Sequence, residues 1–309
     1  MKCMKCGVEA VFQRLYSGEA LCRNHYLRSV EQRVYTAIKS RRMLTPTDTT
    51  AVALSGGKDS TALLHILHGL EKRFPKAKLA AVTVDEGIKG YRREALAIAR
   101  ENCARLGVEH AVVSFKEFYG LSLDAVVRRV RKLKSGLTPC AYCGVLRRKA
   151  LNHAAKRLNA SKLATAHNLD DFVQTLLLNI FHGDIYRLTR TEPVTTESGG
   201  RFVVRIKPLY EVPEAETALY AYLQGIKFQS TPCPYAGTAL RSDLRVIVNG
   251  MESKHPGIKY TILRTFEKVI PAIKEETKCV ELRTCGNCGD PSIGNLCKPC
   301  EMLQQINVI

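Results

Sequence analysis

The sequence contains no apolar run that approaches the roughly 20 residues needed to cross a bilayer. Its opening stretch, MKCMKCGVEA, lacks the apolar centre of a signal peptide. Acidic residues are also few, because 29 Asp and Glu stand against 47 Lys and Arg, which leaves a formal net charge of +18. These absences predict a soluble, cytoplasmic protein with no membrane partner.

The surplus of positive charge attracts polyanions, and nucleic acid is the usual one. The alternative interpretation of this charge is an evenly basic, soluble surface with no specific partner. We rank nucleic acid higher because the charge is clustered, in Arg128, Arg129, Arg131, Lys132 and Lys134 and again in Arg147, Arg148 and Lys149. A membrane surface is a less suitable partner, since no long amphipathic helix with large aromatic side chains is evident.

Twelve cysteines would suggest disulfides in a secreted chain, but without a secretion signal they indicate metal or redox chemistry. Eight ligands form the patterns C-x2-C…C-x2-H and C-x2-C…C-x2-C at the two ends: Cys3, Cys6, Cys22 and His25, then Cys285, Cys288, Cys297 and Cys300. Paired soft ligands predict two tetrahedral Zn²⁺ ions with no open position, and hence structural zinc ribbons. The alternative for His25 is an ordinary surface histidine. Spacing alone does not show whether the ribbons also grip RNA.

Between the ribbons, short apolar runs alternate with helical periods. Strands are expected at 51–54, 79–84, 111–115, 163–165 and 203–206. Helices are expected at 60–70, 91–106, 123–133, 143–158, 172–181, 213–224, 239–254 and 260–269, with a loop over 190–201. This alternation predicts an α/β fold, a doubly wound parallel sheet with ligands at the carboxyl ends of its strands. We expect an N-terminal zinc finger over 1–30, the sheet domain over 31–273, and a linker with the C-terminal zinc finger over 274–309.

The first strand runs into SGGKDS, residues 55–60, whose two glycines let the backbone approach an anion at the start of the next helix. A Walker A loop would need Gly at position 52 and Ser or Thr at position 59, where this chain has Val52 and Asp59. Transfer of a γ-phosphoryl group is therefore disfavoured. A plain glycine turn explains Gly56 and Gly57, but not the serines, lysine and aspartate around them.

These residues resemble a known family. SGGKDS is similar to the pyrophosphate loop (PP-loop) of the adenine-nucleotide alpha hydrolases, which split ATP between the α and β phosphates and adenylate a substrate. VDEGIKGYRREA (84–95), PCAYCGVLRR (139–148), AHNLDD (166–171) and CPYA (233–236) follow in the order of the TtuA/NcsA/TtcA-like tRNA thiolases, and both end ribbons match as well. One departure is Ala166, where the family usually has Gly, and its methyl group is expected to narrow the space near the nucleotide.

The resemblance implies that ATP and Mg²⁺ serve to adenylate the C2 oxygen of a uridine in tRNA, and that sulfur then replaces this oxygen. Ser55, Gly56, Gly57 and Ser60 would cradle phosphate, Lys58 would add positive charge, and Asp59 would hold Mg²⁺ or assist proton transfer. The other implied nucleotide contacts are Ala53, Leu54, Thr83, Arg147, Ala166 and Asp171. Helix capping is the alternative for Asp170 and Asp171, and a solvated helix face for Arg147. We favour function for Asp171 and Arg147, and structure for Asp170.

Five cysteines lie outside the two end patterns. Cys103 falls on the inner face of a helix and Cys279 in a linker, so we expect a core residue and a free thiol. Cys140 and Cys143 have a candidate partner in Cys233, because TPCPY repeats the pattern of TPCAY. Three thiolates cannot close a tetrahedral zinc site, but they can hold a [4Fe–4S] cluster on three irons.

The resemblance implies that the fourth iron binds the sulfide that attacks the adenylated base. The second hypothesis for these thiols is a persulfide on one cysteine, resolved by another. The third is another zinc site, completed by water or by His167. The resemblance leaves two sulfur donors open, namely sulfide and the thiocarboxylate of a ubiquitin-like carrier, and it is compatible with a homodimer.

The expected target is the wobble uridine U34, because VDEGIKGYRREA and CGVLRRKAL (143–151) look more like the wobble-uridine branch than the branch that modifies U54 in the T loop. The basic helix at 128–134, with Arg147 and Arg148, would then hold anticodon-arm phosphates. Adenylation followed by attack of an amine is a rival function, against which the three cysteines argue. An RNA-binding zinc protein with a regulatory nucleotide site is another, which release of AMP would exclude.

Overall fold

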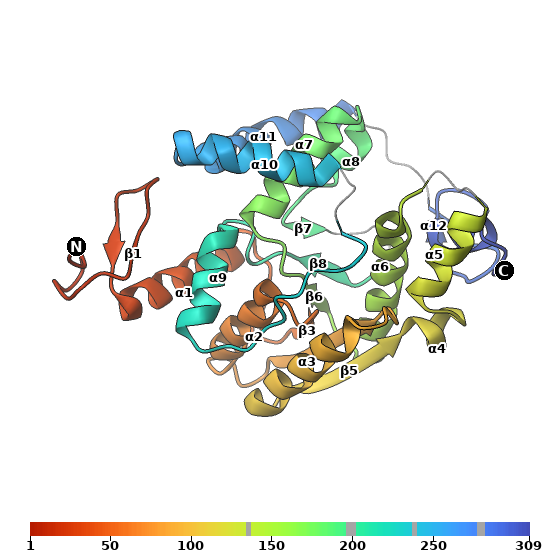
Figure 1. Ribbon diagram of the computed structural model, residues 1–309, viewed down its shortest axis with the longest axis horizontal. Helices are drawn as coiled ribbons and strands as arrows, with labels where there is room; N and C mark the ends of the chain where they lie inside the picture. Colours follow the sequence, from red (N-terminus) through yellow and green to blue (C-terminus); the bar gives the residue numbers. More distant parts are fainter. Residues whose placement is uncertain (134–136, 196–201, 237–239, 277–281) are drawn as a thin grey trace.

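A six-stranded sheet forms the centre of the protein (Figure 1). The computed structural model describes the chain except for residues 134–136, 196–201, 237–239 and 277–281. Across the sheet, the parallel strands are β5 (Glu109–Ser114), β4 (Lys78–Asp85), β3 (Thr49–Ala53), β6 (Lys162–Ala164) and β8 (Val204–Ile206). The last strand, β7 (Val194–Thr195), runs antiparallel to β8. The predicted doubly wound parallel sheet is confirmed.

Helices surround this sheet in three groups. Those in contact with its strands include α2 (Lys58–Glu71), α3 (Arg92–Leu106), α4 (Phe115–Tyr119) and α6 (Pro139–Arg157). A separate layer at the top of Figure 1 contains α7 (Leu169–Phe181), α8 (Ile185–Thr189), α10 (Leu240–Lys254) and α11 (Ile258–Glu276). The others cover neighbouring helices: α1 (Arg23–Ser40) and α9 (Glu214–Leu223) pack on α2, and α5 (Leu123–Lys132) packs on α6.

The core lies between the sheet and these helices. The leucines predicted on the apolar side of the first sheet helix, Leu63, Leu64 and Leu67, are buried there. Cys103 is also buried, and burial raises the pKa of its thiol to about 11. This confirms that Cys103 is a core residue with little thiolate character at neutral pH.

One helix starts earlier than the sequence predicted, and this changes the description of its cysteines. Helix α6 begins at Pro139, before the expected start at 143, because Thr138 caps it and accepts a hydrogen bond from the Ala141 amide at 3.3 Å. Cys140 therefore lies in the first turn of the helix and Cys143 at the start of the second, and the spacing of three residues puts both on one face.

Other differences are local. The stretch 190–201, expected to be a loop, contains the edge strand β7, although residues 196–201 lie outside the described residues. Helices α1, α4 and α8 were not anticipated, nor was α12 (Lys298–Gln304) near the C-terminus. The expected domain boundary at residue 30 falls inside α1, and Lys134 and Cys279 lie outside the described residues.

The two terminal ribbons lie at opposite ends of the molecule (Figure 1). The N-terminal one contains β1 (Phe12–Gln13) and β2 (Ala20–Leu21), and its buried Arg14 pairs with Glu216 of α9 at 2.7 Å. The C-terminal one contains β9 (Arg283–Thr284), β10 (Pro291–Ser292) and α12, which packs on α6. Among the described residues, no helix is long and apolar enough to cross a membrane.

Candidate functional site

The SGGKDS segment forms the turn between β3 and α2, at the carboxyl edge of the sheet. Gly56 has φ of +88°, and a Cβ there would lie 2.6 Å from the carbonyl oxygen of Ala95, so only glycine fits. The hydroxyls of Ser55 and Ser60 lie 3.0 Å apart. Gly57 is the N-cap of α2, so the first-turn amides of that helix face the loop. This loop has the amides and hydroxyls that a pyrophosphate group requires.

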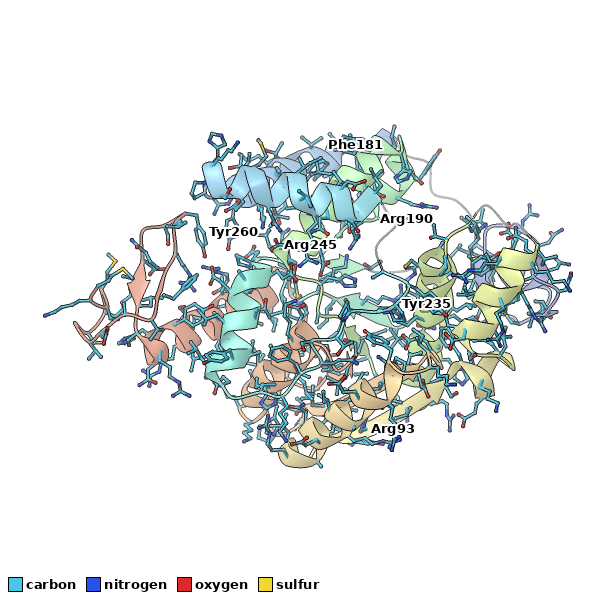
Figure 2. The ribbon with its side chains drawn as sticks, in the orientation of Figure 1. Arg93, Phe181, Arg190, Tyr235, Arg245 and Tyr260 are labelled. Atoms are coloured by element: carbon cyan, nitrogen blue, oxygen red, sulfur yellow. The ribbon has the colours of Figure 1, made fainter. Side chains whose placement is uncertain are left out.

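Lys58 is held in place by two carboxylates. Its ammonium lies 2.8 Å from Asp59 and 2.8 Å from Glu214, which comes from the first turn of α9. Burial opposes the charge of Lys58, but these carboxylates prevail and raise its pKa. Glu214 also pairs with Arg245 at 2.9 Å, and Figure 2 shows Arg245 on the helical layer above the sheet. The lysine is therefore fully charged and oriented beside the phosphate loop.

A second group of polar side chains comes from the AHNLDD segment. Asn168 caps α7, and Asp171 completes a capping box with it, while the other oxygen of Asp171 lies 3.5 Å from Arg241. Burial raises the pKa of Asp171 to about 6, and Arg241 opposes this shift. Burial also raises the pKa of Asp59, whose Oδ1 accepts a hydrogen bond from Asn168 at 3.3 Å. The two carboxylates belong to one site, from two different strand ends.

Asp170 has a structural role, as the sequence suggested. It is buried, accepts a hydrogen bond from the Glu214 amide at 2.8 Å and pairs with the ammonium of Lys259 on α11. It therefore ties α7 to α9 and α11, and so fixes the helices that carry Asp171 and Glu214.

The residues expected beside adenosine lie at strand ends, with their side chains mostly turned inward. Leu54 and Thr83 are buried, and the Thr83 hydroxyl donates to the Leu54 carbonyl at 2.7 Å and contacts His110. Ala53 is partly buried, and Ala166 packs against the core after β6. These positions leave mainly backbone atoms to face a nucleotide, so their contact with one remains a prediction.

The structure brings the third cysteine to the first turn of α6. The backbone of Gln229 donates to the Gly56 carbonyl at 2.8 Å, which anchors the segment that leads to Cys233 beside the phosphate loop. Two residues further on from Cys233, the Tyr235 carbonyl accepts from the Cys140 thiol at 3.2 Å. Burial, and then the charge of Cys233, raise the pKa of Cys140. Figure 2 shows Tyr235 beside α6. The three thiols and the phosphate loop thus share one edge of the sheet.

Arg147 lies with the cysteines rather than with the loop. It donates to the Cys143 sulfur at 3.0 Å, and its Nε lies 3.1 Å from the buried carboxylate of Glu86. Glu86 also pairs with Arg92 at 2.8 Å, and Arg92 donates to the carbonyl of Ser55 at 3.1 Å. One buried carboxylate therefore connects the sulfur site with the phosphate loop. Sequence reasoning missed Glu86 and Glu214, because nothing local to either residue marks a partner so distant along the chain.

The ligand atoms of each terminal set lie within 4.8 Å of one another. The sulfurs of Cys6 and Cys22 lie 3.7 Å apart, and those of Cys288 and Cys297 lie 3.5 Å apart. A Zn–S bond of about 2.3 Å in a tetrahedron places sulfurs about 3.8 Å apart. His25 presents Nδ1, which lies 3.3 Å from the Cys22 sulfur. Both sets therefore fit Zn²⁺.

The Cys140, Cys143 and Cys233 set differs from these tetrads. In the part of the chain that the structure describes, no convergent group of possible metal ligands includes these thiols or His167. The ring of His167 bonds instead to the Thr165 hydroxyl at 3.0 Å. This does not support another zinc site completed by His167. A cubane cluster binds each thiolate through a different iron, so its ligands need not converge on one point.

Part of the basic surface has internal partners. Arg129 donates to the carbonyls of Ile306 and Asn307, at 3.3 and 2.9 Å. Lys149 donates to the Cys288 sulfur at 2.8 Å and pairs with Asp290 at 3.0 Å. These two residues dock the C-terminal ribbon on α5 and α6. Arg129 and Lys149 therefore have internal partners, which corrects the expectation that the clustered basic residues all serve to bind RNA.

Comparison with known proteins agrees with this geometry. A family model described as a PP-loop domain matches residues 27–249. The tRNA 2-thiolation protein NcsA of Haloferax volcanii is 36% identical over 100% of both chains. The cytoplasmic tRNA 2-thiolation protein 1 of Danio rerio is 36% identical over 99% of this chain and 89% of its own. The chain belongs to the PP-loop family of tRNA 2-thiolation proteins.

A solved structure of this family matches over the same length. It is the U34-tRNA thiolase NcsA from Methanococcus maripaludis with its [4Fe-4S] cluster. Its TM-score is 0.85, at 33% sequence identity, and the match covers 100% of this chain and 97% of that one. The resemblance inferred from the order of the PP-loop, cysteine and zinc-ribbon motifs is thus confirmed at the level of the family and of the fold.

Proposed function

We propose that this protein is an ATP-dependent tRNA 2-thiouridine synthase that modifies the wobble uridine U34. One observation carries the proposal: the Gly56–Gln229 hydrogen bond and the Cys140–Tyr235 contact place three thiols and a pyrophosphate loop at one edge of the sheet. An enzyme that activates an oxygen with ATP and replaces it with sulfur needs both in reach of one base. Two relatives named as tRNA 2-thiolation proteins support the activity, and the matching solved structure, a U34-tRNA thiolase, supports the target.

The loop residues bind and orient ATP in this proposal. Amides at Gly57 and the start of α2 receive the β and γ phosphates, with the hydroxyls of Ser55 and Ser60 beside them. The C2 oxygen of the base attacks the α-phosphorus, and pyrophosphate leaves with the bridging oxygen. Lys58 neutralises charge that develops on the leaving group. Asp59 and Asp171, which both hydrogen-bond with Asn168, would hold Mg²⁺.

The thiol set has the donor chemistry for a [4Fe–4S] cluster. Cys140, Cys143 and Cys233 would hold it through three irons, and Arg147, which donates to the Cys143 sulfur, would offset part of its negative charge. When bound, the cluster supplies an iron with no protein ligand, open to an external sulfur atom. The chain's own residues hold its position relative to the phosphate loop, through Glu86 and Arg92.

The terminal tetrads are proposed as structural zinc sites. All four positions of each ion would be filled by protein ligands, so neither site has room for a substrate. Their place in the fold agrees with this, since each ribbon is anchored to a helix of the central domain by buried or charged contacts.

Two experiments test the activity and its target. With labelled ATP and unmodified tRNA, the protein is expected to form AMP and pyrophosphate, whereas ADP and phosphate would assign it to a different enzyme class. Mass spectrometry of Lys, Glu and Gln tRNAs from a deletion strain is expected to show loss of sulfur at U34. Loss at U54 with intact U34 thiolation would reverse the target while leaving the chemistry in place.

A further inference from the structure

A basic hollow lies beside the site, at the start of α3. It has a volume of about 370 Å³ and includes Lys89, Arg93 and Arg100 in its lining. All three side chains are exposed, and no ion pair with an acidic residue is found for any of them among the described residues. Figure 2 shows Arg93 on the outer side of α3. These three cations are therefore available to an anionic partner.

The acidic residue in the hollow, Asp85, forms no ion pair with these cations among the described residues. Asp85 uses Oδ1 to accept the Gly87 amide at 2.9 Å, and so closes its own turn. That turn requires glycine, because Gly87 has φ of +68° and a Cβ there would lie 2.7 Å from the Ser122 Cβ. Arg92 forms the inner wall and is occupied by Glu86 and the Ser55 carbonyl. The hollow thus offers three cations that have no ion-pair partner among the described residues.

One carboxylate links this hollow to the sulfur site. Asp124 of α5 accepts the Lys89 amide through Oδ2 at 3.0 Å and the Tyr235 hydroxyl through Oδ1 at 2.6 Å. Tyr235 in turn contacts Cys140 through its carbonyl. A polyanion bound at Lys89 would therefore lie next to the segment that contacts Cys140.

We propose that this hollow binds backbone phosphates of the tRNA next to the target base, an inference that rests on the proposed function. Nucleic-acid interfaces are rich in Lys and Arg, whereas the centre of a protein–protein interface is apolar. Only Ile88 and Leu96 contribute larger apolar side chains here, and Ile88 is buried. This chemistry favours RNA over an acidic carrier protein. Phosphate contacts position the strand, so the hollow sets the register of the substrate and not its sequence.

The test is the salt dependence of binding to an unmodified tRNA transcript. The triple variant Lys89→Gln, Arg93→Gln, Arg100→Gln is compared with Lys72→Gln, Lys76→Gln, Lys78→Gln. The control removes the same charge, but its residues are exposed at the other end of the sheet, before and at the start of β4. Removing one cation that binds a phosphate lowers the slope of log K against log salt by about 1. We expect the slope to fall by about 2 to 3 in the hollow variant, and by less than about 1 in the control.

The metal content and melting temperature of both variants should match those of the unsubstituted protein, which excludes misfolding. An unchanged slope and affinity in the hollow variant would overturn the inference. So would unchanged tRNA binding together with a raised KM for a thiocarboxylated carrier protein, which would assign the hollow to that partner. Because binding is measured without turnover, failure of the unsubstituted protein to thiolate tRNA counts against the proposed function and not against the hollow.

Discussion

Cysteines in two regions of this molecule are placed in contrasting ways. At the two ends, four ligand atoms lie within 4.8 Å of one another, and nearby residues such as Lys149 and Arg14 fasten each ribbon to the domain. At the carboxyl edge of the sheet, Cys140 and Cys143 lie near the start of α6. Cys233 lies on the segment that follows Gln229, whose backbone amide bonds to Gly56. In this interpretation, four converging ligand atoms indicate a structural metal site. Three cysteines beside a phosphate loop instead indicate a catalytic site.

The largest expected effect comes from the incomplete set. Replacing Cys140, Cys143 or Cys233 by Ala should lower thiolation by about 10³-fold or more, the scale for loss of a principal catalytic group. Folding should be largely unaffected for Cys140 and Cys233, which are exposed and partly buried, whereas loss of the buried Cys143 thiol should lower stability modestly. Single-turnover thiolation and thermal melting measure the two effects.

Cys103→Ala is the matched control for that series. It removes a buried core thiol that belongs to neither the terminal ligand sets nor the group of three catalytic thiols. It should therefore reduce stability modestly and leave thiolation intact. If it lowers activity as much as the Cys233 variant, the distinction between catalytic and core thiols is wrong.

The tetrads should show the opposite behaviour. Cys6→Ser or Cys288→Ser should remove one of about two zinc ions per chain and lower the free energy of unfolding by several kcal/mol, because zinc contributes on the order of 10 kcal/mol to local folding. Zinc analysis and denaturant titration measure both. Full stability after removal of zinc by a chelator would contradict a structural role.

Lys58 should matter for adenylation alone. Lys58→Ala is expected to slow formation of AMP by about 10²- to 10³-fold, the usual effect of removing one group that stabilises developing charge. Iron and zinc content should stay unchanged, because the ion pairs of the Lys58 ammonium among the described residues are with Asp59 and Glu214 and not with a cysteine. Lys72→Ala, at an exposed position near the end of α2, provides the control. An equal loss of AMP formation in both variants would contradict a specific role of Lys58 in adenylation.

The smallest effect is on pH dependence. The raised pKa of Asp171, about 6, means that the folded state binds a proton more tightly than the unfolded state. The free energy of unfolding therefore falls as the pH rises from about 4 to about 6. Mg²⁺-dependent ATP binding should rise as the carboxylate ionises in the folded state, with a midpoint at about pH 6. Asp171→Asn should flatten both profiles, and a variant that keeps the pH dependence of the unsubstituted protein would show that another group is responsible.

Features set by local spacing could be predicted from the sequence. The tetrads, the SGGKDS turn and the strand–helix alternation depend on neighbouring residues, and the structure reproduces their positions. Partners distant along the chain could not be predicted: Arg147 pairs with Glu86, and Arg129 donates to carbonyls of the C-terminal segment. The helix expected from 143 starts at Pro139 in the structure, and Thr followed by Pro is a typical helix start that the prediction did not use.

The most direct test of this account is the metal content of protein purified without air. We expect about four iron atoms with acid-labile sulfide, and about two zinc ions, per chain. In a Cys140→Ala, Cys143→Ala, Cys233→Ala variant, iron should be lost and zinc retained. Iron absent from the reconstituted protein, or retained in this variant, would contradict the assignment of the three thiols.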